Sequence, residues 1–125
     1  MDRLAAFLRA LTDAGTSADH IDAGDVPEVV GLDVGAVSVA AVAFDGSGGV
    51  RTRYQRHHGH PARVARALLE DLGAPPGVAI GLVGSDAHAL TSQGVGVQVD
   101  AVRALIDVGR AWRPEVRHVM DIGGA

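Results

Sequence analysis

The sequence predicts an α/β domain in which helices pack on a mixed five-stranded sheet. Short apolar runs of strand length alternate with stretches that carry apolar residues at helical spacing. Tight Gly-containing turns join the first three runs, which predicts an antiparallel meander. A later run is apolar throughout, as in a strand buried on both faces. The expected order is therefore β-β-β-α-β-α-β, with helices flanking the sheet.

The meander comes first. Its first strand is expected over Val29–Asp33, before Gly35, and its second over the Val- and Ala-rich run Val37–Phe44. The following Asp-Gly-Ser-Gly-Gly segment is a strong turn signal. Val50–His57 then alternates in polarity and is expected to form the third strand.

A helix should follow the meander. Pro61 suits its first position because the fixed φ of proline matches helical geometry, and Gly73 is placed to end it. The residues expected on its core face are Val64, Leu68 and Leu72, with Ala65 and Leu69 beside them.

The remaining elements complete the predicted sheet. Val78–Val83 is expected to be the buried strand, followed by a turn over Gly84–Asp86. A second helix is expected over Val99–Ala111 and a last strand over Val116–Ile122. The positions of the second helix expected to face inward are Val102, Leu105, Ile106 and Gly109.

Residues 1–28 are expected to lie outside this body, which covers residues 29–125. Asp2–Ala14 has the spacing of a short helix, and Gly15–Pro27 is small and acidic, as in a linker. We interpret its acids as a solvated loop, because the bidentate Glu of an EF-hand calcium loop is missing.

The composition excludes several kinds of chemistry. The chain has 125 residues and no Cys, so it holds no disulfide, zinc thiolate site or cysteine-bound iron–sulfur cluster. All 11 basic residues are Arg. Without Lys, neither a P-loop nor Schiff-base catalysis is available.

Charge and hydropathy exclude further partners. The net charge is −4 and no segment concentrates basic residues, which argues against nucleic acid and anionic membranes as ligands. No apolar run approaches the roughly 20 residues of a membrane span. The missing Cys and the absence of a targeting segment lead us to expect a cytoplasmic protein.

Two turns place an Asp at the end of a strand and a Gly shortly after it. They are Gly31–Gly35, which contains Asp33, and Met120–Gly124, which contains Asp121. Because glycine has no side chain, the backbone N–H groups of such a turn can approach a phosphate closely. The Asp carboxylate can hold Mg²⁺ through water. Two such turns at one sheet edge would clamp a phosphate chain.

With this element order, the two turns resemble the RNase H-like, phosphate-binding half of the actin, sugar kinase and heat-shock chaperone superfamily. Within it, the chain resembles the acyl-CoA dehydratase activases, which activate 2-hydroxyacyl-CoA dehydratases and benzoyl-CoA reductases. The similarity covers about Val30–Ala125. The stretches that carry it are Gly31–Gly35, His60-Pro61 before an Ala/Leu-rich helix, Gly81–Ser85, and Pro114 leading into Val119–Gly124.

The resemblance implies an ATP-dependent activator that binds ATP or ADP with Mg²⁺. In that family hydrolysis is coupled to electron transfer into a partner dehydratase or reductase, through an iron–sulfur cluster that this Cys-free chain cannot ligate. Both Asp residues would lie near Mg²⁺. The implied phosphate contacts are Asp33, Gly35 and Ser38 in the first turn, and Asp121, Gly123 and Gly124 in the second.

The first turn departs from the family pattern. Ala36, Val37 and Ala40 occupy positions where the family has small hydroxyl residues and a Lys, and Ser38 keeps a hydroxyl. The family continues after the second turn with a second subdomain that carries the adenosine pocket. We therefore expect an actin-like half-domain with little or no ATPase activity alone, and an exposed apolar patch or self-association.

Two other readings stay open. The chain could be a degenerate, non-catalytic module that pairs with a partner protein or a separately encoded second half. It could also be a small relative that binds sugar or acyl phosphates with the same clamp.

Two polar groupings carry weaker signals. His57, His58 and His60 are neighbours in a loop, which rarely gives a closed metal site, so we expect them to flank the helix instead. Ser85 and His88 are spaced like a nucleophile and its base. No oxyanion hole accompanies them, so a shared solvated face is the favoured interpretation.

Overall fold

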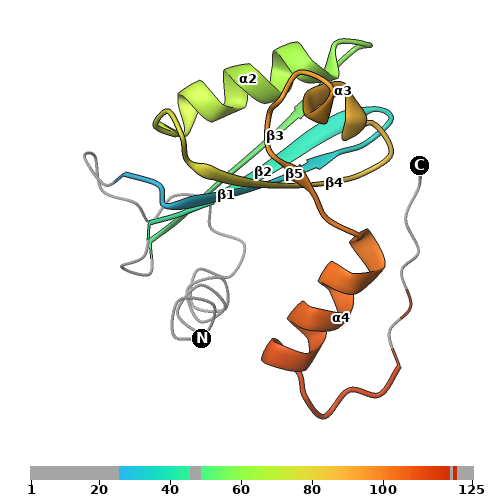
Figure 1. The fold of residues 1–125 in the computed structure, drawn as a ribbon. Helices are drawn as coiled ribbons and strands as arrows, with labels where there is room; N and C mark the ends of the chain where they lie inside the picture. Colours follow the sequence, from blue (N-terminus) through green and yellow to red (C-terminus); the bar gives the residue numbers. More distant parts are fainter. Residues whose placement is uncertain (1–25, 46–48, 119, 121–125) are drawn as a thin grey trace.

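Five strands form one open mixed sheet in the order β3-β2-β1-β4-β5, with helices on both sides of it (Figure 1). The computed structural model describes residues 26–45, 49–118 and 120. The strands are β1 (Val29–Val34), β2 (Ser38–Phe44), β3 (Val50–Arg56), β4 (Ala79–Val83) and β5 (Val97–Gln98). The helices are α2 (Pro61–Asp71), α3 (His88–Thr91) and α4 (Ala101–Trp112). The expected α/β class with a mixed five-stranded sheet is confirmed.

The antiparallel meander is also confirmed, with strand bounds within one residue of those expected. β1 pairs with β2 so that Val34 lies opposite Val39, and β2 pairs with β3 so that Ser38 lies opposite Arg56. The tight connections predicted this arrangement, because only antiparallel neighbours can be joined by so few residues.

β4 lies on the other side of β1 and runs parallel to it, with Asp33 opposite Val83. The chain reaches β4 from β3 through α2, the kind of crossover that parallel strands require. β5 pairs parallel with β4 in turn. The carboxyl ends of β1 and β4 therefore meet at one edge of the sheet.

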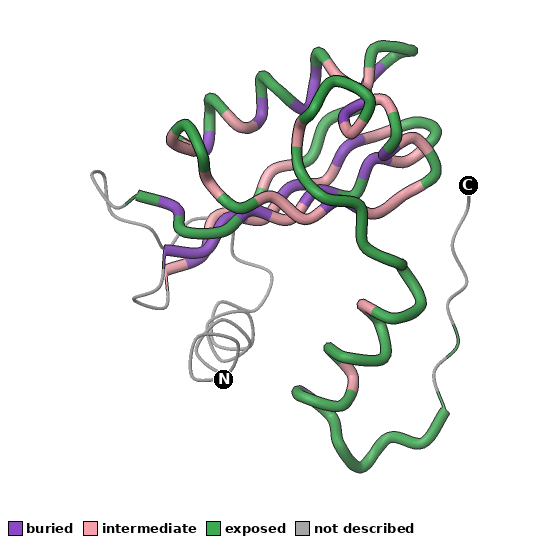
Figure 2. Tube along the Cα trace, viewed as in Figure 1, coloured by how far each residue is buried: buried purple, intermediate pink, exposed green. Residues whose placement is uncertain are grey.

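The core lies between one face of the sheet and helices α2 and α3 (Figure 2). As expected, α2 starts at Pro61, and Gly73 follows it with a left-handed φ of 71°. Arg53 of β3 pairs with Asp71 at the end of α2, which fixes the helix over the meander. The core residues are Val30, Leu32, Val34, Val39, Ala41, Ala43, Val64, Ala65, Leu68, Leu72, Leu82, Ala87 and Leu90.

The opposite face of the sheet is less well covered. In β4 only Leu82 is fully buried, so the expectation of a strand buried on both faces is wrong. The uncovered face borders an apolar cavity of about 530 Å³ between the sheet and α4. Small residues leave this space open, among them Gly31, Ala40 and Gly81.

Helix α4 lies on that second side, and its apolar stripe is not packed inward (Figure 1). Ala104 and Val108 line the cavity under the sheet. The residues expected to face inward do not: Val102, Leu105 and Ile106 are 66%, 38% and 42% exposed. Helical periodicity identifies an apolar stripe but does not say which surface covers it.

Two polar contacts within its own sequence stabilise helix α4, one at its N-terminus and one along the helix. The Asp100 carboxylate accepts a hydrogen bond from the backbone N–H of Arg103 at 2.8 Å, so it caps the N-terminus. The Arg103 guanidinium in turn pairs with Asp107 one turn further along the helix.

The fifth strand is not where the sequence predicted it. Residues 116–118 and 120 of the expected strand Val116–Ile122 have no strand structure, and residues 119, 121 and 122 lie outside the described residues. The sheet instead takes Val97–Gln98, held beside β4 and followed by a 2.7 Å hydrogen bond from Val99 N–H to Leu82 O. Two residues are too few to show a strand period.

The expected N-terminal helix and nearly all of the acidic linker, residues 1–25, lie outside the described residues. Among the helices that the structure describes, none is long and apolar enough to cross a membrane.

Candidate functional site

The candidate site lies where β1 and β4 end side by side. Asp33, near the end of β1, is exposed to solvent. The turn after β4 folds back onto β1: the backbone N–H of Asp86 donates to the carbonyl oxygen of Val34 at 2.9 Å. The parallel pairing of the two strands therefore brings a carboxylate and a glycine-containing turn together.

Gly84 makes this close approach possible. Its φ is +110°, a value that residues other than glycine rarely adopt. A Cβ built on it would collide with the carbonyl oxygen of Val34 and would lie 2.7 Å from Oδ1 of Asp33. The Asp33 carboxylate thus occupies the space that any side chain at position 84 would need.

The turn between β1 and β2 forms the neighbouring wall. Its N–H group at Gly35 donates to the carbonyl oxygen of Ser38 at 2.9 Å, and Ala36 and Val37 are exposed at the tip. Gly35 has no left-handed φ, and a Cβ there would lie 3.5 Å from Ser38 O, an ordinary contact. The backbone and the space at this position would therefore accept alanine.

A buried histidine supports this turn from behind. The His57 side chain is 4% exposed, and its Nε2 lies 2.8 Å from the carbonyl oxygen of Gly35. Its Nδ1 accepts a hydrogen bond from the N–H of Gly59 at 3.1 Å. Because Nδ1 is an acceptor, the ring proton of the neutral tautomer is on Nε2, which donates to Gly35.

His57 also faces the β4 turn. Its Nε2 lies 4.0 Å from Oδ2 of Asp86, whose side chain is about one third exposed. The backbone N–H of His57 donates to Val37 O at 3.0 Å, so both its main chain and its ring hold the β1–β2 turn. His57 therefore holds the β1–β2 turn and lies beside the β4 turn, and these are the two turns that border Asp33.

The loop after β3 is itself a tight turn. The N–H of His60 donates to the carbonyl oxygen of His57 at 2.8 Å, and both central residues have positive φ, 48° at His58 and 82° at Gly59. Two positive φ angles define a type I′ turn. This turn brings the end of β3 back towards the start of α2 and sets the His57 ring inward.

Three of the predicted site residues, Asp33, Gly35 and Ser38, lie together at this edge. The other three, Asp121, Gly123 and Gly124, lie outside the described residues, as does half of the predicted metal pair. Over residues 26–45, 49–118 and 120, no group of three or more His, Cys, Asp and Glu side chains could hold a metal ion.

The two weaker sequence signals do not form sites among the described residues. Both His57 ring nitrogens have partners in the backbone, so the three loop histidines do not converge on a metal. Ser85 and His88 are exposed, and within the described part of the chain no hydrogen bond joins their side chains.

Sequence reasoning missed two members of the site, His57 and Asp86. The sequence predicts His57 at the end of the third strand and among three neighbouring loop histidines, but not as a buried support of the β1–β2 turn. A usable signal was the hairpin register, because the end of β3 must lie beside the β1–β2 turn. Asp86 gave no such signal, since its position depends on the parallel pairing of β1 with β4.

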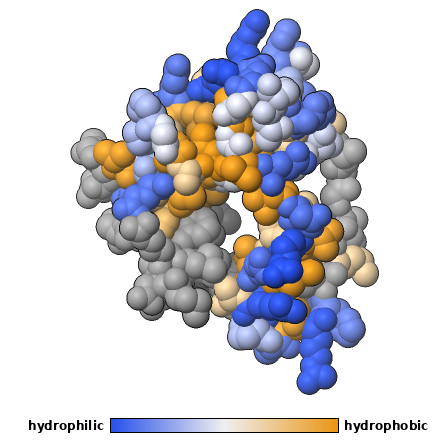
Figure 3. All heavy atoms as spheres, in the orientation of Figure 1, coloured by the Kyte–Doolittle hydropathy of each residue, from blue (hydrophilic) through white to orange (hydrophobic). Residues whose placement is uncertain are grey.

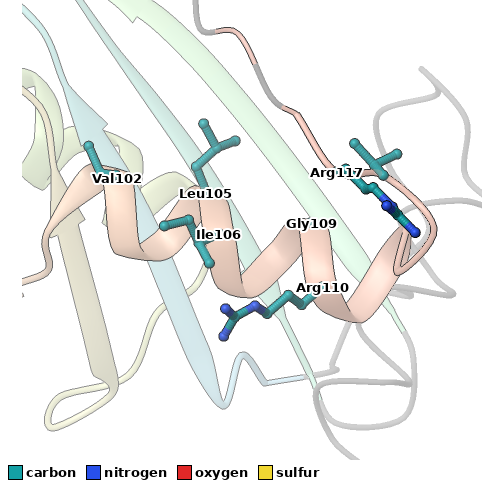
Figure 4. Close-up of a pocket in the computed structure, with 7 residues that line it drawn as sticks. Val102, Leu105, Ile106, Gly109, Arg110 and Arg117 are labelled. Carbon is teal, nitrogen blue, oxygen red and sulfur yellow. The ribbon is translucent and has the colours of Figure 1, made fainter.

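A second hollow lies on α4, away from this edge. It has a volume of about 410 Å³, and Val102, Leu105 and Ile106 line it from the helix (Figure 4). Arg110 and Arg117 lie towards the end of the helix and beyond it. Apolar and charged side chains are mixed on the surface around α4 (Figure 3). The charged rim and apolar floor resemble an interaction surface more than a catalytic site.

No protein-family model matches this chain, and no curated protein matches it in sequence. The fold class defined by strand order and pairing is an α/β domain with an open mixed sheet. The site at the edge of β1 and β4 must therefore be interpreted from its own geometry.

Proposed function

We propose that this chain supplies the phosphate-binding side of an actin-like nucleotide site, in a protein of the acyl-CoA dehydratase activase type. One observation carries the proposal: the Asp33 carboxylate lies against Gly84, beside the turn from Gly35 to Ser38. The strand order supports it, because β2 runs antiparallel to the other four strands, as in the RNase H-like fold.

The residues at this edge suit a phosphate chain with Mg²⁺. Mg²⁺ is commonly bound through one or two carboxylates, several waters and the phosphates themselves. Asp33 is exposed at the strand end and can serve as such a carboxylate. Bound Mg²⁺ would neutralise phosphate charge, while Ser38 and the exposed backbone at the turn tip would donate hydrogen bonds.

By resemblance, Asp121, Gly123 and Gly124 would supply the second phosphate contact. The partner would be a dehydratase or reductase, or a second subdomain that closes over the nucleotide. The described residues form one open wall, with Asp33 and Ala36 both exposed. Because an open site does not exclude water or fix the adenosine, we expect nucleotide binding with little hydrolysis.

Isothermal titration calorimetry with Mg-ATP and Mg-ADP tests this proposal. The wild-type chain should bind both, and Asp33→Ala should weaken binding at least tenfold. Glu70→Ala is the matched control, because it removes the same charge from an exposed position on α2. Equal affinities of wild type and Asp33→Ala would contradict the proposal.

A second candidate is a non-catalytic module that pairs with a partner protein or a separately encoded second half. The apolar stripe of α4 favours it, because Val102 is 66% exposed and Ile106 42% exposed. This candidate predicts association through α4 without nucleotide. An absence of heat with either nucleotide, together with α4-dependent association, would select it.

A further inference from the structure

We propose that Arg56 is the cation of this site and that it binds the terminal phosphate of a polyphosphate ligand beside the β1–β2 turn. The nucleotide part of this inference rests on the proposed function; the anion site itself does not. Arg56 is the last residue of β3 and precedes the buried His57. It was not among the residues that the sequence pointed to.

The sheet register puts Arg56 on the face that carries Asp33. Arg56 lies opposite Ser38, and Ala40 lies opposite Asp33. Residues opposite each other in an antiparallel pair point to the same face, as do residues two apart along a strand. Asp33, Ser38, Ala40 and Arg56 thus share one face at one end of the sheet.

A cavity adjoins Arg56 at this end of the sheet, and its lining does not include Asp33 or Ser38. Its volume is about 360 Å³, which is ample for a phosphate group, and it adjoins the tip of the β1–β2 turn. It lies between that turn and the type I′ turn after β3, which together supply its backbone walls. Its lining residues are Ala36, Val37, Arg56, His57, His58 and Gly59.

The other arginines of β3 have partners, whereas Arg56 has none among the described residues. Arg53 pairs with Asp71, and Arg51 donates to the carbonyl oxygen of Leu72 at 3.3 Å. Both side chains therefore bind at the C-terminal end of α2. The Arg56 side chain is exposed and forms no hydrogen bond or ion pair with residues 26–45, 49–118 or 120. Its guanidinium is available to a ligand.

The arginine side chain is well suited to bind phosphate. A guanidinium presents a planar fork of N–H donors that binds two phosphate oxygens at once, and it stays charged at any physiological pH. Ala40, opposite Asp33, is small and carries no charge. Arg56 would therefore provide the positive charge that no residue of the first turn provides.

Calorimetry of the full chain with pyrophosphate, Mg-ADP and Mg-ATP tests the inference. Arg56→Gln should weaken Mg-ATP and pyrophosphate binding about ten- to a hundredfold, as expected for loss of a charged hydrogen bond. Arg56→Lys should fall in between, because it keeps the charge but loses the fork. Arg63→Gln, an exposed arginine of α2 outside the cavity, should bind like wild type.

The outcomes separate this inference from the proposed function. If Arg56→Gln binds Mg-ATP as tightly as wild type while Asp33→Ala does not, the role of Arg56 is refuted and the nucleotide site stands. If Arg56 is needed for pyrophosphate but nucleotide binding does not depend on Asp33, the anion site stands alone. If the wild-type chain binds none of the three ligands, both proposals fail. Thermal unfolding of Arg56→Gln, expected to match that of Arg63→Gln, shows whether the variant is folded.

Discussion

The ring of His57 donates a hydrogen bond from Nε2 to the carbonyl oxygen of Gly35 across 2.8 Å, at the end of the sheet where Asp33 lies. The same ring accepts from Gly59 and lies 4.0 Å from the Asp86 carboxylate. A buried imidazole with partners on both nitrogens is a structural clamp between two turns. The position of the candidate phosphate site depends on it.

Replacing His57 should therefore loosen the β1–β2 turn. His57→Ala removes the hydrogen bonds of the ring to Gly35 O and from Gly59 N–H, and it opens a cavity. We therefore expect a loss of about 1–3 kcal/mol in the free energy of unfolding. Urea denaturation measures it. His60→Ala is the control, because the exposed His60 side chain makes no capping hydrogen bond to the described start of α2. Equal losses in the two variants would show that the His57 contacts are not stabilising.

Gly84 should tolerate no side chain. Gly84→Ala combines an unfavourable φ of +110° with a collision against Val34 O, and we expect it to destabilise the protein by about 2–4 kcal/mol. Gly77→Ala separates the two effects: its φ is +79°, but a Cβ there meets no described atom within 4 Å. Its loss should be about 1 kcal/mol. Similar midpoints in urea for both variants would argue against close packing of Gly84 on β1.

Gly35 offers the opposite test. Because the space and backbone at this position accept a Cβ, Gly35→Ala should change the free energy of unfolding by no more than about 1 kcal/mol, in the stabilising direction if at all. If a phosphate approaches the turn closely, the same methyl group should weaken Mg-ATP binding at least tenfold. Denaturation and calorimetry on one sample measure both. Unchanged affinity would place the phosphate away from this turn.

The exposed stripe of α4 should drive association. Val102→Ser removes an apolar side chain that is 66% exposed, so it should leave stability nearly unchanged while reducing self-association or binding of a second half. Light scattering after size-exclusion chromatography gives the mass. Val37→Ser is the matched control, because Val37 is 47% exposed and lies in the β1–β2 turn rather than on α4. A mass that falls equally in both variants would point to a surface other than α4.

The parts of the fold that could be predicted from sequence are those with local causes. The meander follows from turn residues and the alternation of β3, and α2 follows from Pro61, Gly73 and an apolar stripe. The two-residue β5 has no local signal, because it is too short to show a strand period and is defined by its pairing with β4. The face of α4 was also assigned wrongly, since a stripe of apolar residues does not identify the surface that covers it.

Some residues of the candidate site likewise have a local sequence signal, and others do not. Asp33, Gly35 and Ser38 could be chosen from one short segment, because an Asp followed by Gly at a strand end is a local pattern. His57 is distant in sequence from Gly35, and its burial depends on how β3 and the type I′ turn fold back. Arg56 looked like one of several strand arginines until the register separated it from Arg51 and Arg53.

The strand order has a consequence for aggregation. Strands at the edges of a sheet can pair with other molecules unless they are short or charged. β3, at one edge, carries three arginines, and β5, at the other, has only two residues. Both edges thus resist the strand-to-strand stacking that leads to fibrils, so contacts between copies of this chain should form through helix α4 and should be reversible.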